Sequence, residues 1–171
     1  MYLAFSFMRI LGIDPGLALV GFGIIDCIGN SYKLVDYGVI ETKAGLPLPS
    51  RLEKIYKLMD QLIETYKPEE VAFEELFFNK NVKTAIAVGH ARGVEILACK
   101  NKGLDIFEYT PLQIKQAITG YGRADKKQIQ EMVKLLLNME KIPKPDDAAD
   151  GLAVAITHAS SLNFKDMFRM R

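Results

Sequence analysis

Residues 10–16 read Ile10-Leu11-Gly12-Ile13-Asp14-Pro15-Gly16. The four apolar residues are typical of a buried β-strand, and Pro15-Gly16 is a turn signal that ends it. Asp14 is therefore predicted to close the strand and to present its carboxylate at the edge of a sheet. An aspartate that only shapes an Asp-Pro-Gly turn would have the same local sequence, so Asp14 alone does not define a site.

A second acid stands at the end of another apolar run. Glu74 follows Val71-Ala72-Phe73, and Glu75 is its neighbour. An acidic residue that closes an apolar strand is costly unless it has a partner or an ion. We therefore expect Glu74 to lie near Asp14, with Glu75 as the alternative.

Two further acids open the last predicted helix. Asp147 and Asp150 follow Pro145, and their i, i+3 spacing puts both on one face. Asp147 could instead be a simple N-cap, and Asp146 could replace it. The shared face favours Asp147.

These acids suit a phosphodiester-cleaving enzyme. Carboxylate oxygens select Mg²⁺ or Mn²⁺ over zinc, and a two-metal site holds its ions about 3.5–4 Å apart. Four crowded carboxylates repel one another, so without metal at least one should hold its proton unusually tightly. The predicted catalytic residues and metal ligands are the same four: Asp14, Glu74, Asp147 and Asp150.

Length and composition predict a single domain over residues 1–171. The chain is 49% hydrophobic, which is enough for a real core. Residues 1–7 are expected to be an extra N-terminal segment, with Met8 as a candidate start, and residues 163–171 a flexible tail. Cys27 and Cys99 lack zinc or disulfide spacing. No apolar run approaches the roughly 18 residues of a membrane span, so we expect a cytoplasmic protein.

Charge is unevenly distributed along the chain. The formal net charge is +1, but residues 76–145 carry 12 Lys or Arg against 6 Asp or Glu. A basic surface beside an acidic pocket suits a nuclease, because cations hold phosphates while carboxylates hold metal. A solvated helical face would give the same count. The predicted DNA-binding residues are Phe77, Lys80, Lys115, Arg123 and Lys126.

The pattern of elements predicts an α/β fold. Strands over 9–13, 20–27 and 32–42 form an antiparallel meander, with a turn at Gly29-Asn30. A capping box at Ser50 starts a helix, after which strand 70–74 should lie parallel to the first. The remaining predicted elements are a helix over 82–100, a strand over 105–109, and helices starting at Thr110, Asp125 and Asp146. The result is a mixed sheet with helices on both faces.

Two features of the predicted helices remain open. Gly89 and Gly93 would let another helix approach closely. His90 and His158 have no second His at ligand spacing, so each is interpreted as a packing or surface residue. His158 lies about two turns beyond Asp150 on the same helix, so a supporting role is also possible.

Four motifs occur in order along the chain: Leu11–Gly16, Phe73–Phe77 with Asn79–Asn81, Gly89–Gly93, and Asp147–Ala153 with Ala155–His158. Together they resemble the RuvC family of Holliday-junction resolvases, from about Met8 to about Ser160. This chain departs from the family pattern at His90, a position where Gln is common in the family. The position of Asp147 is His in some relatives, which indicates that this ligand is replaceable.

The resemblance implies a ribonuclease-H-like fold, a homodimer and Mg²⁺-dependent paired, symmetric incisions in four-way junction DNA during recombination and repair. It implies that the four acids are catalytic, that Phe77 stacks near the junction centre, and that Lys115 and Lys126 lie close to the cleaved backbone. The helix with Gly89 and Gly93 would form the dimer. The implied partner is a branch-migration motor of the RuvA and RuvB type.

We accordingly expect a Holliday-junction endonuclease that uses two Mg²⁺ ions, with Mn²⁺ as a substitute, and leaves 5′-phosphate and 3′-hydroxyl ends. The alternatives are a non-catalytic junction-binding dimer, another ribonuclease-H-like nuclease, and a phosphotransferase of the actin and sugar-kinase type. The last needs a second lobe and a second Gly-rich loop, for which the chain has no room.

Overall fold

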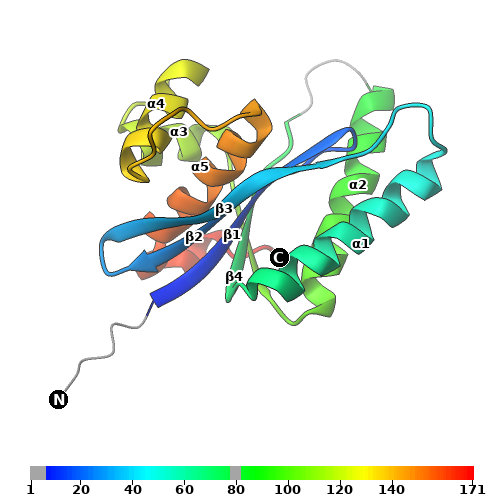
Figure 1. Cartoon of the computed structure of the whole chain (residues 1–171), viewed down its shortest axis with the longest axis horizontal. Helices are drawn as coiled ribbons and strands as arrows, with labels where there is room; N and C mark the ends of the chain where they lie inside the picture. Colours follow the sequence, from blue (N-terminus) through cyan, green and yellow to red (C-terminus); the bar gives the residue numbers. More distant parts are fainter. Residues whose placement is uncertain (1–6, 78–81) are drawn as a thin grey trace.

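The computed structural model describes residues 7–77 and 82–171. Its elements follow one another in the order β1 (Phe7–Asp14), β2 (Leu19–Ile28), β3 (Ser31–Glu41), α1 (Leu48–Tyr66), β4 (Glu70–Glu74), α2 (Val82–Asn101), β5 (Asp105–Tyr109), α3 (Pro111–Thr119), α4 (Lys126–Leu136), α5 (Asp146–Ser160) and the 3₁₀ segment η1 (Leu162–Phe168). Helices α1 and α2 cover one face of the sheet, whereas α5 lies on the other face with α3 and α4 beside it (Figure 1).

The five strands are arranged in the order β3-β2-β1-β4-β5. Strands β1, β2 and β3 pair antiparallel, and β4 is parallel to both β1 and β5. This confirms the predicted mixed sheet and the parallel return after the crossover helix. Because β1 and β4 are parallel neighbours, Asp14 and Glu74 end at the same edge of the sheet.

Alternation along β1 divides the core into two parts. Ile10 packs with the residues under α5, whereas Leu11 and Ile13 pack with the residues under α1 and α2. All three are 0% exposed, as expected for a central strand whose side chains point alternately to two covered faces. In the described part of the chain, no helix is both long and apolar enough to cross a membrane.

One local prediction was wrong, and one strand is longer than predicted. Helix α1 begins at Leu48 rather than at a Ser50 cap, and no side chain caps it. Pro49 accounts for the difference, because proline has no N–H to satisfy and its fixed φ suits a first helical turn. The strand that carries Asp14 begins at Phe7 rather than at residue 9, and Phe7 pairs with Ile28.

The C-terminal tail is ordered, contrary to the expected flexible segment over 163–171. After η1, the amide of Met170 donates to the Ile106 carbonyl oxygen at 2.9 Å. The Phe168 ring lies 4.7 Å from the Tyr109 ring, centroid to centroid. Apolar contacts and a backbone bond therefore fasten the tail to the edge strand β5, which its polar composition did not reveal.

Candidate active site

Helix α5 lies directly on the backbone of the sheet. A Cβ added at Gly12 would stand 2.2 Å from the Gly151 carbonyl oxygen, and one at Gly21 would stand 1.9 Å from that of Asp147. Only hydrogen fits at these two strand positions. Gly21 is also the strand partner of Asp14. The close approach therefore brings the first turn of α5 to the end of β1.

The four predicted acids meet at this place. The charges of Glu74, Asp150 and Asp147 all act on Asp14. Burial, followed by these three charges, raises the pKa of Asp14 to about 8. Three segments that are far apart in the sequence thus place their carboxylates within electrostatic range of one another.

The pKa values of Glu74 and Asp150 shift in the same direction. Burial and the charge of Asp150 raise the pKa of Glu74 to about 7, against the opposing effects of Lys126 and Lys115. Burial also raises the pKa of Asp150, although Lys126 counteracts it at 3.1 Å. Asp14 and Glu74 therefore retain protons near neutral pH, as expected of buried acids whose charge a bound cation would neutralise.

Asp146 behaves differently from these acids. Its Oδ1 accepts a hydrogen bond from Lys144 at 2.8 Å, and this contact lowers its pKa. The charge that acts on Asp14 is that of Asp147. The geometry thus favours Asp147 over Asp146 as the fourth member of the acidic group.

The donors of the acidic group fit hard divalent cations. All are carboxylate oxygens, and a bound cation would offset both the burial and the mutual repulsion that raise the pKa values of Asp14, Glu74 and Asp150. Across residues 7–77 and 82–171, no three His, Cys, Asp or Glu side chains are already close enough to surround an ion. The acids therefore lie within electrostatic range of one another without forming a ready-made cage in the described residues.

Comparison with known proteins decides the family. Residues 10–158 match the family model "Crossover junction endodeoxyribonuclease RuvC". The chain belongs to the RuvC family. The protein of that name from Alkaliphilus oremlandii is 60% identical over 96% of this chain and 100% of its own length. RuvC of Thermus thermophilus has a TM-score of 0.85 at 33% identity, covering 91% of this chain and 96% of its own.

A second structure shows T. thermophilus RuvC in complex with a Holliday junction substrate. It matches this chain with a TM-score of 0.83 and 31% identity, over 91% of this chain and 95% of its own. These neighbours confirm the ribonuclease-H-like fold. They also confirm the resemblance to RuvC nucleases drawn from the four sequence motifs. The family is one of metal-dependent nucleases.

Two lysines flank the acids of this RuvC-family chain. Lys115 and Lys126 line one hollow of about 230 Å³ together with Glu74 and Asp150. Lys126 reaches the acidic group because Asp125 caps α4 through a capping box with Gln128, which starts that helix beside the site. A phosphate in the hollow would meet two cations and two carboxylates.

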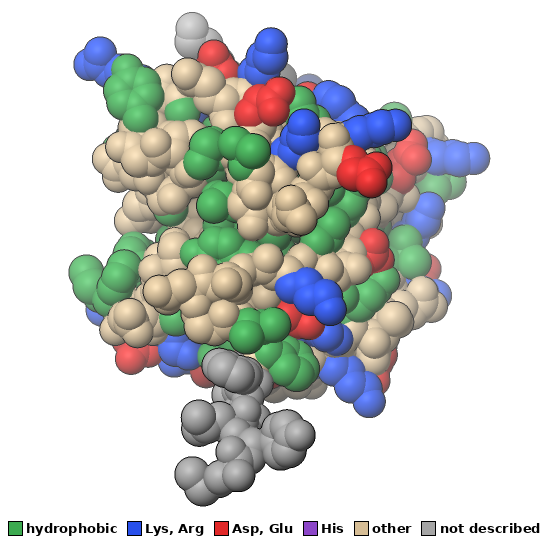
Figure 2. All heavy atoms as spheres, turned by 60° about the vertical axis from the view of Figure 1, so that its left-hand side comes forward, with side chains coloured by type: hydrophobic (Ala, Val, Ile, Leu, Met, Phe, Trp, Pro, Cys, Tyr) green, Lys and Arg blue, Asp and Glu red, His purple; other side chains and the backbone are tan. Residues whose placement is uncertain are grey.

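The other predicted DNA-binding residues are Phe77, Arg123 and Lys80. Phe77 is 63% exposed, in line with a residue that meets a ligand. Arg123 is exposed in the link between α3 and α4. Lys80 lies outside the described residues. Figure 2 shows Lys and Arg interspersed with Asp and Glu on one face of the molecule, so that face is not uniformly basic.

Helix α2 presents the predicted small-residue pair to solvent. Gly89 and Gly93 have open space around the position of an added Cβ. Ile86 and Leu97, on the same helix, are 56% and 51% exposed. This exposed apolar surface is suited to another helix.

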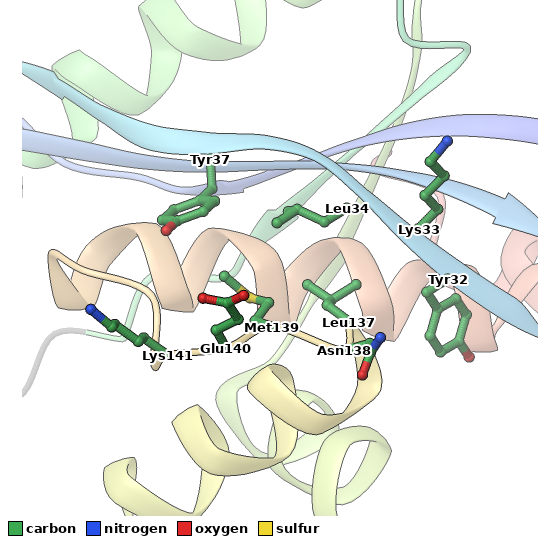
Figure 3. Close-up of a pocket in the computed structure, with 9 residues that line it drawn as sticks. All are labelled: Tyr32, Lys33, Leu34, Tyr37, Leu137, Asn138, Met139, Glu140 and Lys141. Atoms are coloured by element: carbon green, nitrogen blue, oxygen red, sulfur yellow. The ribbon is translucent and has the colours of Figure 1, made fainter.

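A wider groove lies away from the acids. It has a volume of about 670 Å³ and runs between β3 and the segment after α4. Figure 3 shows Tyr37 and Leu34 of β3 above Leu137 and Met139. None of the four acids lines it.

Two buried polar groups compare differently with the sequence analysis: His158 is a packing residue, as expected, whereas Glu95 was missed. His158 is 0% exposed, and its Nε2 lies 2.7 Å from Glu70 while its Nδ1 lies 2.8 Å from the Tyr109 hydroxyl. It is a packing residue with two polar partners. Glu95 of α2 is also 0% exposed. Its signal was present in the sequence, because it is the one acid within the apolar run 94–99.

Proposed function

We propose that this chain is a Holliday-junction resolvase that hydrolyses phosphodiester bonds at the acidic group Asp14, Glu74, Asp147 and Asp150. The observation that carries the proposal is their electrostatic convergence on Asp14. Family membership and the likeness to RuvC in complex with a junction support the choice of substrate.

The acids would hold two Mg²⁺ ions, with Mn²⁺ as a substitute. The chemistry such ions supply is an activated water on one side of the phosphorus and stabilisation of the leaving oxygen on the other. The chain's own contribution is to fix the carboxylates on β1, β4 and α5. Lys115 and Lys126 would neutralise the phosphate on the side facing the hollow. Cleavage would leave 5′-phosphate and 3′-hydroxyl ends.

DNA recognition would extend beyond this hollow. Phe77 stands exposed three residues after Glu74, where it could stack on a base at the junction centre. Arg123 and Lys80 would contact the phosphate backbone. We assign these roles from exposure, charge and the motif positions of the family.

Symmetric incision requires two active sites, and α2 is our candidate for the dimer contact. A second copy of α2 would bury the open surface around Gly89 and Gly93, together with Ile86 and Leu97. Sedimentation equilibrium should show a dimer, and Gly93→Arg should shift it to monomer. In the cytoplasm the dimer would act with a branch-migration motor of the RuvA and RuvB type.

The test compares parental protein with Asp14→Asn on a synthetic four-way junction and on a linear duplex of the same sequence, in Mg²⁺. Parental protein should cut the junction at symmetric positions and spare the duplex. Asp14→Asn should bind the junction but not cut it, because the grip on DNA comes from cations rather than from this acid.

The matched control is Asp60→Asn, which neutralises a partly exposed acid on α1 that pairs with Lys102. It should cut at the parental rate. A parental protein that binds the junction without cutting would point to the rival function, a junction-binding dimer. Cutting by Asp14→Asn at near the parental rate would overturn the assignment of Asp14.

A further inference from the structure

Glu95 is a buried acid outside the acidic group. It lies on the sheet-facing side of α2, where Ala91 and Ala98 are also 0% exposed. Carboxyl groups are seldom buried without hydrogen-bonding partners, because burial removes the water that solvates them. An alanine or leucine would fill the position at no such cost.

The contacts of Glu95 point toward the active site. Its Oε1 accepts a hydrogen bond from the amide of Gly16 at 3.4 Å. Gly16 belongs to the turn that follows Asp14, and the charge of Asp14 acts on Glu95. Within the described part of the chain, Oε2 of Glu95 is buried and has no hydrogen-bond partner.

We propose that Glu95 is a positioning residue for Asp14: from α2 it holds the 14–16 turn through the Gly16 amide and so fixes where the Asp14 carboxylate is presented. The inference rests on the proposed function of Asp14. It adds a link from α2, on one face of the sheet, to the acids gathered at the end of β1.

The direction of the contact supports positioning rather than a further ligand. Glu95 reaches the backbone of the turn from the α2 side, whereas Asp147 and Asp150 approach from α5 on the opposite face. Asp14 therefore lies between the acids of α5 on one side and the turn contact from α2 on the other. Displacing a reacting group by about 1 Å can cost up to about a hundredfold in rate, so a loosened turn should have a measurable effect.

The test uses three variants of the full chain. Glu95→Ala removes the contact. Glu95→Gln keeps the shape and an acceptor for the Gly16 amide. Cys99→Ala is the matched control, because Cys99 is 0% exposed one turn further along α2 and its truncation also leaves a cavity.

The readouts are kcat and KM for junction cleavage, and hydrogen exchange of the Gly16 amide measured by NMR without DNA. We expect Glu95→Ala to lower kcat about tenfold with KM within about twofold of the parental value, since binding is left intact. Its Gly16 amide should exchange faster. Glu95→Gln should restore both quantities, and Cys99→Ala should leave both near parental.

The proposal is overturned if Glu95→Ala keeps the parental kcat, if Cys99→Ala loses as much activity, or if Glu95→Gln fails to rescue. Unchanged Gly16 exchange in Glu95→Ala would also overturn it. These results are distinct from failure of the proposed function. In that case the parental protein itself would not cut the junction, while Gly16 exchange would still report on the contact.

Discussion

The two ends of α5 make opposite use of buried charge. At its N-terminal end, Asp147 and Asp150 join Asp14 and Glu74. Burial and mutual repulsion raise the pKa values of Asp14, Glu74 and Asp150. At its C-terminal end, His158 lies with Glu70, whose pKa is lowered. The N-terminal end of α5 therefore carries buried acids that Lys126 compensates only in part, whereas the single acid at the C-terminal end, Glu70, is fully paired.

The C-terminal group is satisfied within the protein. Burial pushes the pKa of Glu70 up, but hydrogen bonds from His158 and Lys165 outweigh it and leave the pKa below its usual value. The Tyr109 hydroxyl bonds the other nitrogen of His158. Each buried polar atom has a partner, as in a group that serves stability.

The contrast indicates that the N-terminal end of α5 serves function and its C-terminal end serves stability. Uncompensated acids destabilise a fold, so they persist where a ligand requires them. The compensated acid Glu70, paired with His158, instead holds the far end of the helix in place. Neutralising one acid at each end should therefore have opposite consequences for activity and stability.

The largest expected effect is on catalysis by Glu74→Gln. Removing one of four ligand acids should lower junction cleavage about a thousandfold or more, because the charge that holds the metal is reduced. In EDTA the same variant should be more stable than the parental protein by about 1 kcal/mol, since a repelling acid is gone. Cleavage kinetics and urea unfolding measure the two quantities.

Glu75→Gln is the matched control for this variant. Glu75 is the adjacent acid, and its backbone amide pairs with the Tyr109 carbonyl oxygen whatever its side chain. It should cut normally. If Glu75→Gln lost cleavage while Glu74→Gln cut normally, the catalytic role would belong to Glu75 instead of Glu74.

A smaller effect is expected at the other end of α5, and it concerns stability alone. Glu70→Gln leaves Lys165 without its anionic partner and weakens the bond to His158. Removing one member of a buried ion pair costs about 3 kcal/mol of unfolding free energy. Cleavage at a temperature well below unfolding should stay near parental.

The neighbouring Glu69 supplies the comparison for Glu70. It is exposed, and Glu69→Gln should change stability by less than about 0.5 kcal/mol, the usual range for surface substitutions. If Glu70→Gln were equally harmless, the C-terminal group would not stabilise the fold. If Glu70→Gln instead lost cleavage without losing stability, Glu70 would be part of the active site.

Much of this architecture could be predicted because it follows from local chemistry. The strand over 105–109 has the predicted bounds, and the helix predicted to start at Thr110 does so through a capping box with Gln113. Asp14 and Glu74 were recognisable because each interrupts apolar sequence at a strand end. Parallel pairing of β1 with β4 then places both strand ends at the same edge of the sheet.

The missed features depend on contacts between distant segments. Glu70 and His158 are 88 residues apart, and neither has a local pattern that indicates the other. Glu70 looked like the polar start of a strand. Glu95 is an acid within an apolar run that the sequence analysis did not single out, and its contact with Gly16 required knowing how α2 crosses the sheet.

The smallest expected effect, taken per pH unit, is a pH dependence of stability in which the two ends have opposite signs. Asp14 and Glu74 keep protons in the folded protein up to about 8 and about 7, against ordinary values of 3.8 and 4.5. Between these limits the folded chain binds more protons than the unfolded chain. Without metal, its unfolding free energy should therefore fall as pH rises, by at most about 1.4 kcal/mol per pH unit for each proton.

Glu70 acts in the opposite direction and in a different window. Its folded pKa is lowered, so its contribution is present above the ordinary value of 4.5 and is lost as pH falls through the folded value. Urea unfolding in EDTA from about pH 5 to about pH 8 therefore isolates the N-terminal acids, with a share from Glu95, whose pKa is also raised. Mg²⁺ should flatten the slope by holding the acids unprotonated, and Asp14→Asn should reduce it even in EDTA. A slope that Mg²⁺ and Asp14→Asn both leave unchanged would show that the N-terminal acids do not hold these protons, and the contrast between the two ends of α5 would fail.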